Sequence, residues 1–137
     1  APMFNAEKVK ANEVSRYEDL AAPALKGRLS LRNRRSVYNQ SLVAFMLDSP
    51  GEQEMTQWIQ GIMANVAQPV FSSDTPMVGA VAQGDYGVAL ANSYYLGRMQ
   101  AGDKGDADLA LSSKVSAQRL GELNAKAVEL MAANRWQ

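Results

Sequence analysis

Residues 87–98 combine a short apolar run with a helical pattern, and this combination narrows the possible folds more than any other part of the sequence. The apolar run is bounded by Gly84 and Gly87 before it and by Asn92 after it, so it predicts a buried strand. Asn92 or Ser93 is a suitable N-cap for the helix that follows. A buried strand that runs directly into a helix is typical of an α/β fold.

Three tyrosines occupy equivalent places in two such strand–loop–helix units. Tyr94 and Tyr95 stand where the strand of residues 86–91 gives way to its helix. Tyr38 opens a second helix, after a short strand at residues 28–32 and a polar loop at residues 33–36. In open α/β sheets, ligands bind at the carboxyl ends of the strands. We therefore expect the three phenol groups to converge at one edge of the sheet.

The rest of the chain continues this alternation of strands and helices. The spacing of apolar residues and the positions of glycine and proline predict helices at residues 17–22, 38–47, 50–66, 75–83, 94–100 and 116–133. They also predict short strands at residues 2–4 and 70–71. Pro50 is expected at the first position of its helix, where its missing N–H costs little. The alternation predicts an α/β sandwich in one domain.

The composition excludes several classes of function. Lys plus Arg equals Asp plus Glu, at 14 each, so the net charge favours neither nucleic acid nor an anionic membrane as partner. The sequence has no cysteine and no histidine, which removes thiol catalysis, zinc–thiolate sites and the commonest general base. No apolar stretch approaches the ~18–20 residues of a membrane span. We therefore do not expect an enzyme.

The segments around the tyrosines carry a family resemblance. The sequence reads Tyr-Asn-Gln-Ser at residues 38–41 and Ala-Asn-Ser-Tyr-Tyr-Leu-Gly at residues 91–97. Both segments resemble the periplasmic ferric-ion-binding proteins of bacterial iron transporters. The other matching segments are residues 17–21 with Lys26-Gly27, 32–43, 64–65, 80–85, and 120–131 with Trp136. The resemblance is dense from about residue 16 to residue 102 and returns at the C-terminus.

This resemblance implies a three-layer α/β/α sandwich, a single lobe of the type 2 periplasmic-binding-protein fold. It implies a ferric site in which Tyr38, Tyr94 and Tyr95 are the metal ligands, as in the family branch that uses three tyrosines from this lobe. The family binds Fe(III), in some members with a synergistic anion such as carbonate or phosphate. It works in the periplasm with an inner-membrane ABC permease. Tyr17 and Tyr86 lie outside the motif and are expected to be packing residues.

The chemistry of phenol oxygens suits this metal. Fe(III) is a small, highly charged cation that prefers hard oxygen donors. A free phenol has a pKa near ~10, so the cation must displace the proton to bind phenolate. Helix N-termini behind Tyr38 and Tyr94 favour the phenolate charge by about 0.3–1 kcal/mol each. We therefore expect iron binding to release protons and to weaken as the pH falls.

The polar loop before Tyr38 contains candidates for an anion site. Guanidinium groups grip planar oxyanions with two hydrogen bonds, so Arg32 and Arg34, with Ser36, are anion-binding candidates beside the metal. A solvated loop is the plainer interpretation. Arg32 matches the family well, whereas Arg34 and Arg35 stand where small polar residues are more usual.

The length of the chain departs from the family, whose members have two lobes and more than twice this length. We expect residues 1–137 to form one lobe, with residues 16–114 as its body. Residues 116–137 follow directly and resemble the extreme C-terminus of the family. We therefore expect an engineered single-lobe protein with a junction near residues 114–117, and a natural short paralogue is the alternative. The surface that faces the other lobe in the family then offers a site for a homodimer.

Two other functions stay open beside the ferric lobe. The first is a lobe that binds an organic or inorganic anion through Arg32, Arg34 and two helix N-termini. The second is a truncated scaffold with no ligand of its own. Ferric phenolate is coloured, so a visible band on adding Fe(III) would support the ferric lobe. Absence of colour with tight phosphate or carbonate binding would support the anion-binding lobe, and absence of both would support the scaffold.

Overall fold

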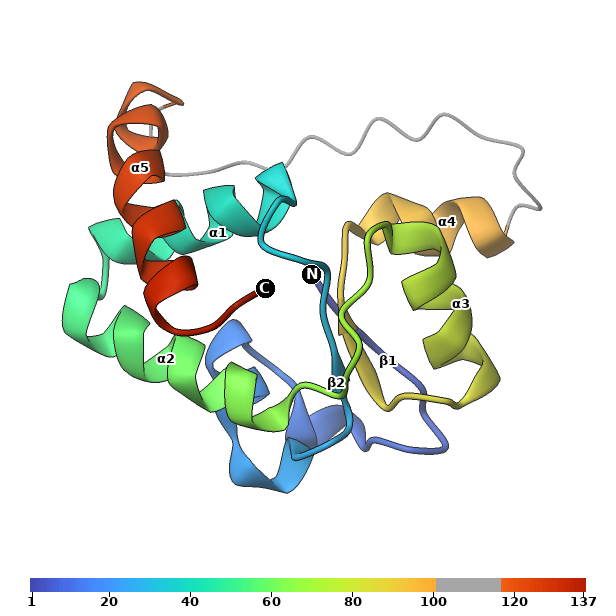
Figure 1. Ribbon diagram of the computed structural model, residues 1–137. Helices are drawn as coiled ribbons and strands as arrows, with labels where there is room; N and C mark the ends of the chain where they lie inside the picture. Colours follow the sequence, from blue (N-terminus) through green and yellow to red (C-terminus); the bar gives the residue numbers. More distant parts are fainter. Residues whose placement is uncertain (101–116) are drawn as a thin grey trace.

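The computed structural model describes residues 1–100 and 117–137 of the chain (Figure 1). Residues 101–116, which include most of the junction expected near residues 114–117, lie outside the described residues. Among the described residues, no helix combines the length and the apolar character that crossing a membrane requires.

A small sheet lies between two groups of helices (Figure 1). One group consists of α1 (Val37–Asp48), α2 (Glu52–Asn65) and α5 (Ala117–Ala133). The other consists of α3 (Asp74–Gln83) and α4 (Ser93–Gln100). The expected three-layer α/β/α arrangement is therefore confirmed.

The described sheet has three strands in the order β1–β3–β2, namely β1 (Pro2–Phe4), β2 (Leu29–Ser30) and β3 (Val88–Leu90). The central strand β3 runs parallel to β2 and antiparallel to β1. Single bridges continue the pairing beyond β2, from Leu29 to Val66 and from Arg32 to Phe71. The strand expected at residues 70–71 is thus reduced to one bridge, and the strand expected at residues 28–32 is shorter than predicted.

The alternation of side chains along β3 divides the interior into two apolar clusters. Val88 and Leu90 face the cluster formed with α1, α2 and α5. Ala89 faces the smaller cluster on the opposite side of the sheet, with Met77 of α3. Successive residues of a strand point to opposite faces of the sheet. Both faces are covered by an apolar cluster, so every residue of β3 is buried. A strand covered on both faces reads as a continuous apolar run, and this is the pattern that the sequence shows.

Two predicted helices differ from the structure, one in its start and the other in its type. Pro50 lies outside α2, because Gly51 precedes the helix as its N-cap with φ 125°, a backbone conformation that is not helical. The helix expected at residues 17–22 is instead a short 3₁₀ helix, η2 (Tyr17–Ala21), between η1 (Ala11–Glu13) and η3 (Pro23–Leu25). The other predicted helices are present within one to two residues of their expected bounds.

Gly61 allows α2 to lie directly against η2. A Cβ atom at Gly61 would stand 2.6 Å from the Cβ of Ala21 and 3.2 Å from its carbonyl oxygen, whereas a Cβ at Gly79 of α3 would meet nothing within 4 Å. Both positions gain up to about 1 kcal/mol of helix propensity from alanine. We expect Gly61→Ala to lower the free energy of unfolding by about 1–2 kcal/mol, because overpacking outweighs this gain. Gly79→Ala is expected to raise it by about 0.5–1 kcal/mol.

Urea denaturation of the two variants measures this difference. Equal stabilisation by both substitutions would contradict the close approach of α2 to Ala21.

Candidate metal centre

The start of α1 places Tyr38 at the surface. Ser36 is the N-cap of this helix, and its hydroxyl accepts a hydrogen bond of 3.5 Å from the backbone N–H of Asn39. Tyr38 is therefore the second residue of the helix, and 48% of it is exposed. Such exposure is unusual for a large aromatic residue that only serves packing.

The end of β3 places the other two tyrosines. The chain leaves β3 through Asn92, and the backbone carbonyl of Asn92 accepts a hydrogen bond of 3.1 Å from the N–H of Tyr95. Tyr94 and Tyr95 then lie in the first turn of α4, each partly buried. Their rings are stacked, with centroids 4.5 Å apart and planes tilted by 32°.

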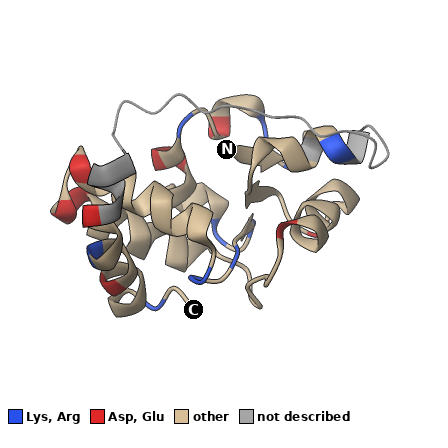
Figure 2. Ribbon diagram, turned by 90° about the horizontal axis from the view of Figure 1, so that it is seen from above, with Lys and Arg blue, Asp and Glu red and all other residues tan. Residues whose placement is uncertain are grey.

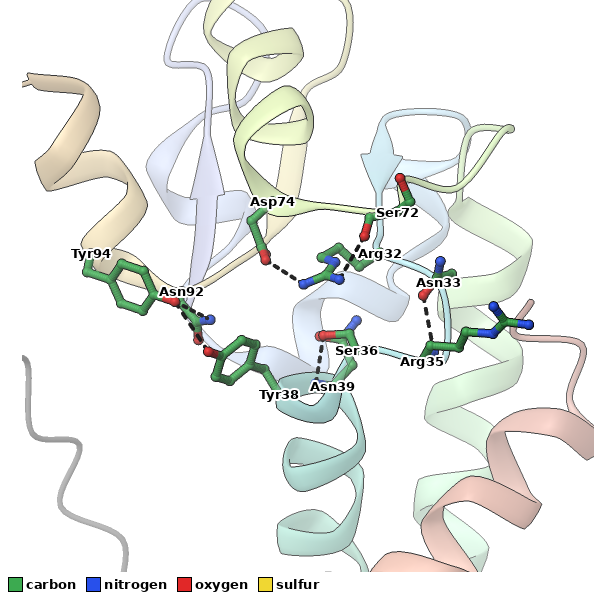
Figure 3. A network of polar contacts seen from close by, with 10 residues as sticks. All are labelled: Arg32, Asn33, Arg35, Ser36, Tyr38, Asn39, Ser72, Asp74, Asn92 and Tyr94. Atoms are coloured by element: carbon green, nitrogen blue, oxygen red, sulfur yellow. Dashed lines mark hydrogen bonds and ion pairs between the residues drawn. The ribbon is translucent and has the colours of Figure 1, made fainter. Parts of the chain in front are cut away.

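The phenol groups from the two units meet at the edge of the sheet (Figure 3). The hydroxyl oxygens of Tyr94 and Tyr38 lie 3.4 Å apart, although 56 positions separate the two residues in sequence. The side-chain amide of Asn92 donates to the Tyr94 hydroxyl over 3.5 Å. The structure therefore brings together the three tyrosines that the sequence singles out.

The phenol groups influence one another's ionisation. The pKa of Tyr38 is raised, first by its hydrogen bond with Tyr94 and then by repulsion between the two phenolates. The contact with Tyr38 acts to lower the pKa of Tyr94, but the hydroxyl of Tyr95 and burial outweigh it, so the pKa of Tyr94 is also raised. Both phenols are consequently protonated at neutral pH when no cation is present.

The side chain of Arg32 forms its contacts with other residues of the protein, at the start of α3. Its guanidinium donates to the carboxylate of Asp74 over 2.7 Å and to the backbone carbonyl of Ser72 over 2.8 Å (Figure 3). Asp74 is only 3% exposed, and the Nε atom of Arg32 is buried without a hydrogen-bond partner. The ion pair thus ties the loop before α1 to the first turn of α3, beside Tyr38, whose pKa both charges influence.

The other anion-binding candidates are not brought together with Arg32. Ser36 is buried and serves as the helix cap. Arg34 is exposed and lines a separate polar cavity of about 440 Å³, together with Asn33, Arg35 and Gln137. The expected anion-binding residues therefore contribute to an ion pair, a helix cap and a cavity at the C-terminal end.

Asp74 and Asn92 were not predicted to be members of the site, and Asn92 was considered only as a helix cap. Helices α3 and α4 carry one charged residue each, Asp74 and Arg98 (Figure 2). Asp74 is the only charged residue between Glu54 and Asp85 in the sequence, and this isolation is the signal that could have linked it to an arginine partner.

The fold and the placement of the tyrosines define a lobe of the type 2 periplasmic-binding-protein class. No protein-family model matches the chain. Over 97 residues it is 42% identical to iron uptake protein A1 of Synechocystis sp. (strain PCC 6803), a match that covers 71% of this chain and 27% of that protein. The chain is thus a homologue of the iron uptake and ferric-binding proteins, and the family resemblance is confirmed.

Solved structures agree with this relationship. The Trichodesmium protein IdiA, or FutA, in complex with iron and citrate matches with a TM-score of 0.84 and 25% identity, over 99% of this chain and 67% of that chain. The apo form of FutA2 from Synechocystis PCC6803 matches with a TM-score of 0.70 and 34% identity, over 88% of this chain and 35% of that chain. The chain spans about a third or less of the curated relatives it matches, at 27% and 32%.

Proposed function

We propose that this lobe binds ferric ion through the phenolate oxygens of Tyr38, Tyr94 and Tyr95. The observation that carries the proposal is the 3.4 Å approach of the Tyr38 and Tyr94 hydroxyls, which come from two different strand–helix units. The stacking of Tyr95 on Tyr94 supports a third phenol ligand in the same site. The relatives named as iron uptake proteins support iron as the cargo.

The donor set matches the charge and the hardness of Fe(III). Three phenolates balance the three positive charges of the ion, and each is a hard oxygen ligand. Tyr38 and Tyr94 both stand in the first turn of a helix, where the dipole favours negative charge. Water or a small anion such as carbonate or phosphate fills the remaining coordination positions. Citrate accompanies iron in the Trichodesmium protein.

Arg32 is the candidate for such an anion, because its charge already acts on Tyr38 and its Nε atom has no partner. Its two terminal nitrogens are held by Asp74 and Ser72, so an anion at Arg32 competes with a carboxylate at 2.7 Å. Arg34 and Ser36 take part only if the loop rearranges. The anion is therefore secondary to the phenolates in this proposal.

The affinity for ferric ion is expected to rise with pH and to fall as the solution is acidified. The pKa values of Tyr38 and Tyr94 are raised, so both phenols hold their protons until the metal displaces them. Binding to three phenolates releases about three protons per ion. A competition titration against citrate at several pH values, read by the ferric–phenolate absorption band, measures this dependence. Tight binding without a coloured band or without proton release would contradict phenolate ligation.

Anion binding is the second candidate function, and the cavity lined by Arg34 and Arg35 favours it. In the same experiment, binding of phosphate without a coloured band would support this alternative. A chain that binds neither iron nor phosphate would be a scaffold with no ligand of its own.

The assembly around the lobe is also a proposal. We place the parent receptor in the periplasm, where it delivers iron to an inner-membrane ABC permease. Helix α1, which carries Tyr38, also exposes the apolar side chains of Val37 and Phe45, at 62% and 37% exposure. This side of α1 is proposed to be the surface that the other lobe of a two-lobed relative, or a second copy of this chain, would cover. Residues 116–137 are proposed to be joined to residues 16–114 by deletion of that other lobe.

A further inference from the structure

The contacts made by the last residues of the chain point to a role in the metal site. We propose that Trp136 is a positioning residue for Tyr38, because it holds the loop of residues 32–36 from the side opposite the sheet bridge. This inference rests on the proposed ferric function. Trp136 is fully buried, and its indole N–H donates to the backbone carbonyl of Arg32 over 2.9 Å.

The backbone around Arg32 explains why this hydrogen bond is needed. On one side, the carbonyl of Leu31 and the N–H of Asn33 both pair with the backbone of Phe71, at 2.9 and 2.8 Å. In an extended chain the carbonyl of the intervening residue points to the opposite side. The indole N–H of Trp136 satisfies the Arg32 carbonyl there, in the place of a neighbouring strand.

The next residue of the chain extends the same arrangement. The backbone carbonyl of Gln137 accepts a hydrogen bond of 2.9 Å from the N–H of Arg34. Two consecutive C-terminal residues therefore hold two alternate backbone positions, Arg32 and Arg34, just before α1 begins.

A continuous set of hydrogen bonds leads from this loop to Tyr38. The N–H of Ser36 donates to the Asn33 carbonyl over 3.1 Å, and the side-chain amide of Gln40 donates to the Arg34 carbonyl over 2.8 Å. Ser36 then caps the helix that carries Tyr38. The body of α1 also packs against α5, the helix that ends just before Trp136. The C-terminal segment thus holds both the loop and the helix of this one ligand.

The other two ligands have a different support. Tyr94 and Tyr95 follow β3, whose neighbours are β1 and β2. Releasing Trp136 would therefore move Tyr38 relative to Tyr94 and Tyr95 rather than move the three together. Metal sites require their ligands to be held within about 0.5 Å of the productive geometry, so a small displacement of Tyr38 weakens binding.

Trp58 provides a matched control inside the same aromatic pair. Its ring lies 6.4 Å from that of Trp136, and its indole N–H donates to the backbone carbonyl of Tyr17 over 2.8 Å. Tyr17 belongs to η2, which packs against α2. Trp58→Phe and Trp136→Phe therefore remove the same kind of hydrogen bond from the same core, but the bond of Trp136 goes to the loop before Tyr38 and that of Trp58 goes to η2.

The experiment compares Trp136→Phe and Trp58→Phe in ferric affinity, in the ferric–phenolate band and in urea denaturation. We expect similar losses of stability from both variants. Only Trp136→Phe is expected to lower ferric affinity, by about fivefold, the usual effect of one neutral hydrogen bond, and to shift the band. Equal ferric affinity and an unchanged band in the two variants would overturn the inference.

A second measurement separates this inference from the proposed function. Amide hydrogen exchange of the metal-free chain reports how firmly the loop is held. We expect Trp136→Phe, and not Trp58→Phe, to accelerate exchange at Asn33, Arg34 and Ser36. If the unsubstituted chain forms no ferric band, the proposed function fails, while this measurement still decides whether Trp136 holds the loop. Unchanged exchange at these amides would overturn the inference even if iron binds.

Discussion

Replacing Tyr94 with phenylalanine is expected to lower the affinity for ferric ion by more than about a hundredfold. Loss of a group that only supports a metal ligand typically costs 10–100-fold, and Tyr94 is proposed to be a ligand itself. Its hydroxyl lies 3.4 Å from that of Tyr38 and accepts a hydrogen bond of 3.5 Å from the side-chain amide of Asn92. Absorbance titration with ferric citrate measures both the affinity and the expected weakening of the charge-transfer band.

Tyr86→Phe is the control for this experiment. Tyr86 is partly buried, as Tyr94 is. It packs edge-to-face on Phe71, with ring centroids 5.7 Å apart. The Tyr86→Phe variant therefore loses one phenol oxygen that is not part of the cluster of Tyr38, Tyr94 and Tyr95. An unchanged affinity in Tyr94→Phe, or an equal loss in Tyr86→Phe, would argue against Tyr94 as a ligand.

Replacing Asp74 with alanine is expected to lower the free energy of unfolding by about 2–3 kcal/mol. The substitution leaves the guanidinium of Arg32 without its carboxylate partner at 2.7 Å. Breaking a fully buried pair typically costs 3–5 kcal/mol, and the side chain of Arg32 is 18% exposed, so solvent reduces the penalty. Urea denaturation with an unchanged m-value measures the loss.

The double variant Arg32→Met with Asp74→Leu tests the reason for that loss. Removing both charges leaves no uncompensated ion, so we expect the double variant to be within about 1 kcal/mol of the unsubstituted chain. A double variant as unstable as Asp74→Ala would mean that the packing of Asp74, rather than its charge, explains the loss.

The convergence of the tyrosines follows from a feature that the sequence does predict. Each tyrosine unit begins with a strand that leads into a helix, and parallel strands end at the same edge of a sheet. In the structure β2 and β3 are parallel neighbours, with Leu29 opposite Val88. The carboxyl ends of the two strands therefore lie side by side. This adjacency brings Tyr38 and Tyr94 together.

Other features depend on contacts that no local pattern records. Arg32 finds Asp74 42 positions away, and Trp136 finds the Arg32 carbonyl 104 positions away. Local sequence alone does not distinguish Arg32 from Arg34, which lie two positions apart. In the structure Arg32 pairs with Asp74 of α3, whereas Arg34 lines a cavity. Local propensity also failed at Pro50, because a glycine with a left-handed φ separates it from the helix.

A crystal structure of the chain grown with ferric citrate, with iron located by its anomalous scattering, would show whether the three tyrosines bind the metal. We expect one iron site per chain, bonded to the phenol oxygens of Tyr38, Tyr94 and Tyr95, with water or a small anion completing the coordination. Iron bound elsewhere on the chain, or a tyrosine cluster that stays free of metal at saturating ferric citrate, would contradict this expectation.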